Sequence, residues 1–502
     1  MPERKPIFYS ALLLTGVNLL LRLVSTSFQV YISGRIGPAG VGLLQLVLSV
    51  GMLAMTAGMG GIRTSTMYLT AEELGRRRPE NVSRILRGCG VYALIFSGTV
   101  ALCLYLASPI IARLWIGDFE SLPALRLYAL FLPLVCLCGC LTGYFTAANR
   151  ITTLACVEIL EQVCSMGLTL GLLIFWSGND IGKACCSVVA GSGLGTILTV
   201  VLLFILRCRE HPRAGTPIPV TGRLLKIALP LALADDLKAG ISTAENLMVP
   251  KRLALFSGTM APLAAFGIVS GMVFPLLMFP AAILFALSEL LIPELARCAA
   301  AGSDRRIRYL TRRSLQVAML YGCTCCGILF LTAESLCLRL YDNMEAAVQL
   351  RWYTAAVPML YCDIVTDAMT KGLGRQRVCV RYNILTSFMD VGLLFGLLPI
   401  FGMKGYFFSF MVTHLLNFFL SLRNLLRITQ MRIPVHIPLL TISALLVSVW
   451  GCAHLDSPLL RCGAFLLMLP SCLILLGILS KKDFMWVTGL LRSPSAQRKG
   501  GR

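Results

Sequence analysis

Long apolar runs alternate with short polar loops along nearly the whole chain. Most runs have about 18 or more residues, which at 1.5 Å per residue is enough to cross a hydrocarbon core ~30 Å thick. We count about fourteen, so the pattern predicts an all-α polytopic membrane protein. The predicted spans are 8–32, 41–68, 89–112, 124–147, 152–176, 183–206, 226–249, 262–291, 314–333, 352–372, 383–402, 404–424, 435–454 and 459–480.

The first apolar run differs from the others because Arg22 stands near its middle, about 16 Å from its start and close to the membrane midplane. A charge at that depth costs at least ~2.5–3.5 kcal/mol on insertion scales. Polar residues fall within about 100° of arc on this helix. Such a face should contact water or other helices rather than lipid. It comprises Asn18, Arg22, Ser25, Thr26, Gln29 and Ser33.

The seventh span carries a second cation at matching depth. A shift of 216 residues places Arg22 on Lys238 and Gln29 on Glu245, and a shift of 225 places 41–62 on 266–287. Repeats that each hold an even number of spans share one topology and are related by an axis along the membrane normal. The repeat therefore predicts two pseudo-symmetric six-helix lobes and a C-terminal addition. Their bounds are 1–215 and 216–432 for the lobes, 433–480 for helices 13 and 14, and 481–502 for a basic cytoplasmic tail.

Charge placement predicts the orientation. Only 14% of the 502 residues are charged, whereas soluble domains have about 25%, and the mean hydropathy is +0.79. Of the 45 Lys and Arg residues, 32 fall on the side of the predicted spans that holds both termini and 10 on the other side. The positive-inside rule then predicts a multi-pass protein of the cell membrane with both termini in the cytoplasm. This distribution explains the net charge of +21 without nucleic acid.

Ionisable side chains within the spans face a cavity or pair with one another, so they are the candidate site residues. We expect cations and amides to bind an anionic substrate group: Arg22, Lys238, Arg63, Asn18 and Gln29. We expect carboxylates to balance these charges or bind a coupling ion: Glu161, Glu158, Glu245 and Asp235. Two alternatives stay open. The cations and carboxylates pair only to hold the bundle together, or, for Arg63, the side chain snorkels to the cytoplasmic surface.

Four further groups of residues bear less directly on the predicted site: cysteines, glycines, aspartates and prolines. The 20 cysteines lie mostly inside apolar runs and are interpreted as small apolar filler. Gly34, Gly37, Gly40 and Gly42 are interpreted as a tight external turn. Asp390 is interpreted as a lone carboxylate in a packed polar contact. For Asp363 and Asp367, a role in the functional site and a purely structural role both stay open. Prolines crowd the seventh and eighth spans and are interpreted either as hinges of a rocking transporter or as cavity-shaping kinks.

The sequence does not favour an enzymatic function. The pair Asp235–Asp236 lacks the second downstream aspartate that a prenyltransferase uses to share Mg²⁺, and no Gly-rich phosphate loop with its lysine is present. We therefore predict that the chain is not an enzyme and carries no metal or other cofactor. A coupling ion (Na⁺ or H⁺) or the membrane potential is the expected energy source.

Six stretches recur in order in one known superfamily: 19–46, 60–75, 141–150, 157–163, 266–283 and 370–378. Over roughly residues 7–430 the chain resembles the polysaccharide-transporter branch of the multidrug/oligosaccharidyl-lipid/polysaccharide flippase superfamily. Within it the chain is most similar to the stage V sporulation protein B-like family, and it is distantly like the peptidoglycan lipid II flippases. Two positions depart from the family pattern, Thr142 where an arginine is common and Glu245 where an aspartate is commoner, and they bear on the substrate rather than the fold.

The resemblance implies alternating access and a lipid-linked saccharide substrate of the undecaprenyl-pyrophosphate type, moved to the outer leaflet. It implies that Arg22 binds pyrophosphate and that Glu161 belongs to the family's EQ motif. The expected partners are this lipid-linked saccharide, membrane lipids and enzymes of cell-wall, spore-cortex or polysaccharide synthesis. The alternatives are a cation-coupled multidrug exporter of the same fold, a membrane glycosyl or prenyl transferase, and a scaffold for a wall-building complex.

Overall fold

The computed structural model describes residues 4–76, 78–178, 180–209, 220–256, 261–431, 434 and 436–478. Within these ranges the regular structure is helical and contains no strand. Ten of the described helices are long and apolar enough to cross a membrane, or eleven if one bent pair counts as a single span. The fourteen predicted spans fall mostly on helical residues, so the all-α membrane fold is confirmed. Three of them contain a break, at 60–61, 279–281 and 355–356, and the last helix ends at Leu475, five residues before the predicted end of its span. The predicted basic tail lies outside the described residues.

Contacts group the chain into two compact units, Met1–Ala286 with Asn383–Thr413 and Leu287–Tyr382 with His414–Arg502. Each is described by itself. The two six-helix lobes inferred from the repeat are a different division and stay a prediction.

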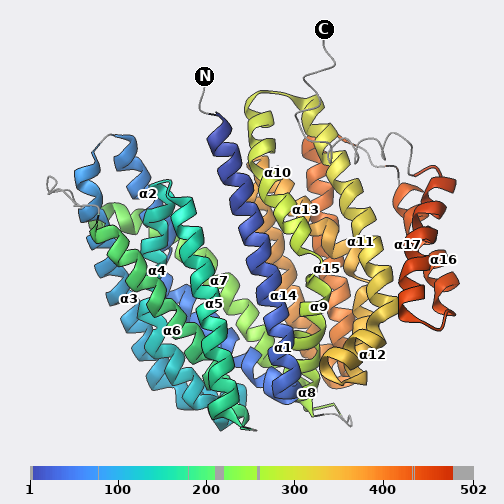
Figure 1. Cartoon of the computed structure of the whole chain (residues 1–502), viewed down its shortest axis with the longest axis horizontal. Coiled ribbons are helices and arrows are strands. Elements are labelled where there is room, and N and C mark those ends of the chain that lie inside the picture. The colour runs from blue at the N-terminus through green and yellow to red at the C-terminus, as the bar shows by residue number, and fades with distance from the viewer. Residues whose placement is uncertain are drawn as a thin grey trace. The chain divides into compact units, whose positions relative to one another are not determined.

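The first unit contains these elements (Figure 1): α1 (Arg4–Met59), α2 (Ile62–Gly75), η1 (Pro79–Asn81), α3 (Val82–Ile110), η2 (Ile111–Ile116), η3 (Phe119–Ser121), α4 (Leu122–Ala147), α5 (Ile151–Leu172), η4 (Leu173–Ser177), α6 (Ile181–Cys208), α7 (Val220–Leu253), α8 (Pro262–Gly267), η5 (Ile268–Val273) and α9 (Phe274–Met278). The second contains α11 (Asp304–Tyr341), α12 (Met344–Thr354), α13 (Val357–Gly372), α16 (His436–Ala453) and α17 (Pro458–Leu475). Three helices belong partly to each: α10 (Ala282–Ala300), α14 (Gln376–Phe401) and α15 (Met403–Thr429).

The first two predicted spans form one long helix with a kink. α1 is non-helical only at Gly37 (φ 81°, ψ 171°), directly before Pro38. Gly34, Gly40 and Gly42 have no positive φ, so the interpretation of all four glycines as a turn is wrong for three of them. A second break follows at Gly60 and Gly61, whose φ values of 46° and 69° suit glycine, and α2 starts there.

Gly42 serves close helix packing instead. A Cβ at Gly42 would lie 2.2 Å from the carbonyl oxygen of Leu263, and one at Gly267 would lie 2.0 Å from the carbonyl oxygen of Pro38. Backbone therefore meets backbone where α1 packs against α8, the arrangement that small residues permit between membrane helices. Directly after α9, the chain bends by 61° at Phe279–Ala281, which includes Pro280.

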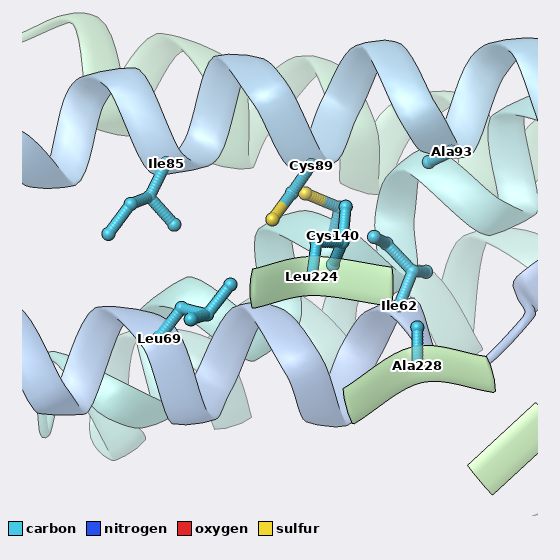
Figure 2. Packing of buried hydrophobic residues seen from close by; sticks show 8 residues of the cluster. All are labelled: Ile62, Leu69, Ile85, Cys89, Ala93, Cys140, Leu224 and Ala228. Atoms are coloured by element: carbon cyan, nitrogen blue, oxygen red, sulfur yellow. The ribbon is translucent and has the colours of Figure 1, made fainter. Parts of the chain in front are cut away.

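A buried apolar cluster joins α2, α3, α4 and α7 within the first unit (Figure 2). Cys89 and Cys140 point toward each other in its centre and are 0% and 1% exposed. Both thiols are free and pack among aliphatic side chains, as expected of small apolar filler. The members are Ile62 and Leu69 from α2, Ile85, Cys89 and Ala93 from α3, Cys140 from α4, and Leu224 and Ala228 from α7.

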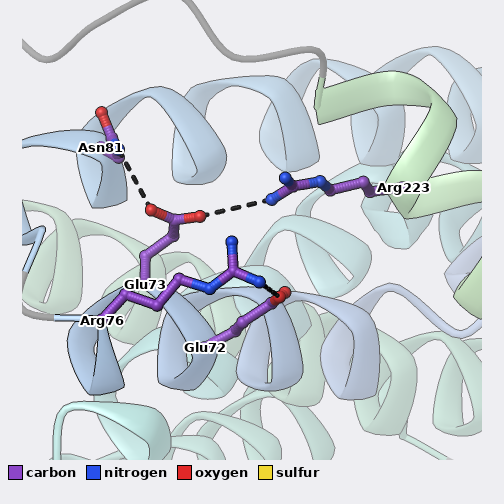
Figure 3. A network of polar contacts seen from close by, with 5 residues as sticks. All are labelled: Glu72, Glu73, Arg76, Asn81 and Arg223. Carbon is purple, nitrogen blue, oxygen red and sulfur yellow. Dashed lines mark hydrogen bonds and ion pairs between the residues drawn. The ribbon is translucent and has the colours of Figure 1, made fainter.

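A buried carboxylate ties the end of α2 to the start of α7 (Figure 3). Glu73, 1% exposed, accepts hydrogen bonds from Asn81 Nδ2 at 3.1 Å and from Arg223 Nη1 at 3.3 Å. Nearby, Arg76 and Glu72 form an ion pair of 2.6 Å on the exposed side of α2. The two pairs differ chiefly in the burial of the carboxylate.

We expect Arg223→Ala to destabilise the protein by about 1–3 kcal/mol, because it leaves Glu73 buried with Asn81 as its remaining described partner. Arg76→Ala is the matched control and should cost no more than about 0.5 kcal/mol, since exposed i,i+4 pairs contribute little. Thermal unfolding of the purified variants in one detergent measures both. Equal stability of the two variants would contradict this, as would failure of Glu73→Gln to recover part of the loss in Arg223→Ala.

Candidate functional site

Arg22 lies on α1 with its guanidinium stacked over the ring of Phe285 from α10, 3.6 Å from the ring centroid. The stack uses the flat face of the guanidinium, whereas its N–H donors point outward in the plane. The contact therefore fixes the plane in which these donors lie. Phe285 was missed by the sequence analysis, because one phenylalanine in an apolar run carries no signal of its partner.

Arg63 belongs to a charged cluster drawn from α2, α4 and α5. Its charge acts on Glu158 and on Cys138, and Glu161 acts on both of these as well. Glu161 also accepts a hydrogen bond from Thr196 Oγ1 on α6 at 3.4 Å. The structure thus brings together three of the predicted site residues, a cation and two half-buried carboxylates, in an arrangement suited to charge balance.

Glu245 on α7 lies within hydrogen-bonding distance of Asp390 on α14, with Tyr406 beside both carboxyl groups. Asp390 also accepts hydrogen bonds from Ser409 Oγ at 2.5 Å and Thr413 Oγ1 at 3.2 Å. The interpretation of Asp390 as part of a packed polar contact is confirmed, but it is not a lone carboxylate. Two carboxylates can only accept hydrogen bonds, so a bond between them requires a shared proton. A bound cation would meet the same need.

The other predicted residues are placed as follows. Lys238 and Asp235 are exposed on α7, with Asp236 next to Asp235. Asn18 lies on α1, but its side chain is outside the described part of the structure. No contact in the described residues places Lys238 against one of the predicted carboxylates. That Arg22 and Lys238 are related by a pseudo-twofold axis and together form one anion site remains a prediction.

The second unit has a polar cluster of its own between α13 and α15. Asn417 Nδ2 donates to Asp363 Oδ2 at 3.1 Å, and Lys371 Nζ lies 3.9 Å from Asp367 Oδ2. The opposite oxygens of both aspartates are buried without a hydrogen bond in the described structure. Asn417 was another residue that the sequence analysis missed.

Gln29, the remaining predicted residue, lines a cavity of ≈ 400 Å³ between α1, α5 and α6. The cavity begins at Ser25, one turn of α1 beyond Arg22. A second cavity of ≈ 220 Å³ shares part of this lining and includes Tyr128 and Phe131. The lining is Ser25, Phe28, Gln29, Ile32, Ser33, Val41, Leu44, Gln45, Leu48, Gln162, Ser165, Met166, Thr169, Val188 and Ser192.

Comparison with known proteins places this geometry in context. Residues 15–170 match the MatE family. The chain is 23% identical to Stage V sporulation protein B of Bacillus subtilis (strain 168) over 410 residues, 78% of each chain.

Two solved structures share the fold. One is the lipid II flippase MurJ in an inward closed conformation, with a TM-score of 0.66, 12% identity, and 96% of this chain and 99% of that chain covered. The other is an inward-facing multidrug resistance MATE family transporter of the MOP superfamily, with a TM-score of 0.61, 16% identity, and coverage of 84% and 100%. The resemblance drawn from the sequence is confirmed: this chain is a multi-pass membrane protein, it is similar in sequence to the MatE family and to Stage V sporulation protein B, and it shares its fold with these two solved structures.

Proposed function

We propose that the protein is a flippase that moves a lipid-linked saccharide of the undecaprenyl-pyrophosphate type from the cytoplasmic to the outer leaflet by alternating access. The observation that carries this proposal is Arg22, exposed in mid-span and stacked on Phe285, with its donors in one plane. Guanidinium groups presented in this way bind phosphate oxygens in a bidentate manner. The proposed orientation has both termini in the cytoplasm, where a biosynthetic enzyme would supply the substrate.

The balance of charges supports an anionic substrate. Glu245 is engaged with Asp390, and Glu158 and Glu161 lie in the field of Arg63. Lys238, in contrast, is exposed on α7. Such a distribution favours an anion over a cationic drug, since like charges repel within a low-dielectric cavity.

Reconstitution in liposomes tests the proposal. A fluorescent undecaprenyl-pyrophosphate-linked saccharide is incorporated, and a membrane-impermeant quencher reports the share exposed in the outer leaflet over time. We expect the wild-type protein to accelerate exposure over protein-free liposomes. No acceleration, under an imposed membrane potential, Na⁺ gradient or pH gradient, would contradict the proposal.

A cation-coupled multidrug exporter is the second candidate, favoured by the fold shared with a MATE transporter. The same liposomes loaded with ethidium distinguish the two functions. Ethidium efflux that depends on the protein, together with no lipid translocation, would favour the exporter.

The carboxyl pair of Glu245 and Asp390 supports a further part of the proposal, coupling to H⁺ or Na⁺. We expect Glu245→Gln to lower gradient-driven translocation about tenfold while leaving gradient-independent exchange of the lipid near the wild-type rate, because the neutral amide lacks the negative charge that holds a cation and cannot take up or release a proton. Glu289→Gln, at an exposed carboxylate of α10, is the control. Equal loss of driven transport and exchange would show that Glu245 serves only packing.

A further inference from the structure

The cavity beside Gln29 combines polarity with the absence of charge. Eight of its fifteen lining residues carry a hydroxyl or side-chain amide, and none is ionisable. Within the described part of the chain, the amides of Gln29, Gln45 and Gln162 form no hydrogen bond with protein. Each amide offers two donor hydrogens and an acceptor oxygen. A ligand that fits this lining has many hydroxyl or amide groups and no net charge at this point.

The shape of the cavity depends on α6, whose glycines let neighbouring side chains come close. A Cβ at Gly191 would lie 2.0 Å from Thr169 Oγ1, and one at Gly193 would lie 2.2 Å from the ring of Phe131. The volume of ≈ 400 Å³ is within the range of small-molecule sites, about 300–1,000 Å³.

The adjoining smaller cavity adds apolar and aromatic surface. Tyr128 and Phe131 line it, and Leu48, Val188 and Ser192 line both cavities. Sugar rings present hydroxyl groups at their edges and C–H groups on their faces. Amides on one side and aromatic rings on the other match these two surfaces.

The position along α1 connects the cavity with Arg22. Gln29 lies seven residues beyond Arg22, about 10 Å along the helix, and Ser25 lies between them. We propose that this cavity is the subsite for the neutral saccharide portion of the substrate, with the pyrophosphate at Arg22. The inference rests on the proposed function and names the part of the substrate that these side chains recognise.

Binding to the purified protein in nanodiscs tests this subsite with two probes. One is undecaprenyl pyrophosphate, and the other is the same lipid carrying N-acetylglucosamine. We expect the wild type to prefer the sugar-bearing probe by about tenfold or more. Gln29→Leu and Gln162→Leu should each remove about fivefold of this preference, the effect of losing one or two neutral hydrogen bonds. Affinity for the bare carrier should not change, and this also shows that the variants are folded.

Gln376→Leu, at an exposed glutamine of α14 outside the cavity, is the matched control and should keep the wild-type preference. Arg22→Ala should weaken both probes alike. The inference is wrong if the wild type does not discriminate between the probes, or if the glutamine variants weaken both equally. It is also wrong if the cavity binds ethidium and the same variants abolish that binding.

The anion site at Arg22 and the saccharide subsite in the cavity can be refuted independently of each other. An Arg22→Ala variant that binds both probes normally overturns the anion site but leaves the sugar preference as the measure of the cavity. Binding of neither probe by the wild type overturns both.

Discussion

Replacing Arg22 by alanine is expected to lower translocation of the lipid-linked saccharide about thirtyfold or more. A bidentate, charge-assisted contact contributes about 1.5–3 kcal/mol, and alanine removes both the charge and the paired donors. Arg22→Lys should recover only part of the rate, because an ammonium keeps the charge without the planar pair of donors. The liposome assay described above measures these rates.

Phe285→Leu gives a graded version of the same test. It keeps apolar volume but removes the aromatic face under the guanidinium, so we expect a loss of about fivefold. Arg35→Ala, at an exposed arginine farther along α1, is the control and should retain wild-type activity. A normal rate in Arg22→Ala, with the protein inserted and folded, would remove Arg22 from the transport pathway.

Gly267→Ala is expected to have the largest effect on stability, a loss of about 3 kcal/mol or more. The added Cβ would lie 2.0 Å from the carbonyl oxygen of Pro38 and 2.6 Å from the backbone nitrogen of Gly42. Side chains relieve such clashes by changing rotamer, but two crossing backbones have to move apart, which costs more than ordinary overpacking. Thermal unfolding in detergent and the yield of monodisperse protein measure the effect.

The control is Gly98→Ala in α3, where nothing lies within 4 Å of the added Cβ. There alanine should leave stability unchanged or raise it by up to about 1 kcal/mol, through its higher helix propensity. Similar unfolding temperatures for the two variants would show that α1 and α8 do not pack as closely as the structure indicates.

Hydrophobic pattern and length were enough to predict the helices, because each span must satisfy its own backbone within the membrane. They did not predict where the helices break. The run from Val41 continues past Met59 in composition, yet the helix breaks at Gly60 and Gly61. The break before it lies at Gly37 rather than at Gly42. A glycine in a turn and a glycine under a crossing helix look alike in the sequence, since the difference lies in the neighbour.

The candidate site, too, could be predicted only in part from the sequence. The depth of Arg22 follows from its place in an apolar run, so an unusual residue could be identified without a structure. Its contact with Phe285 could not, because the two residues are far apart in the chain. Glu245 was predicted to balance a cation or to bind a coupling ion, and the sequence did not indicate that its neighbour in the structure is a second carboxylate, Asp390. Periodicity indicates the face on which a residue lies, and only tertiary packing decides which helix meets that face.

The crossing of α1 and α8 also limits how the first unit can deform. Backbone groups in contact at Gly42 and Gly267 interlock, so neither helix can slide along the other without first separating. Movement that keeps the contact is rotation, with the crossing as its pivot. Displacement then grows with distance from that point. Arg22 is about 20–30 Å away along α1, so a rotation of about 10° would carry its guanidinium about 4 Å while Gly42 stayed in place.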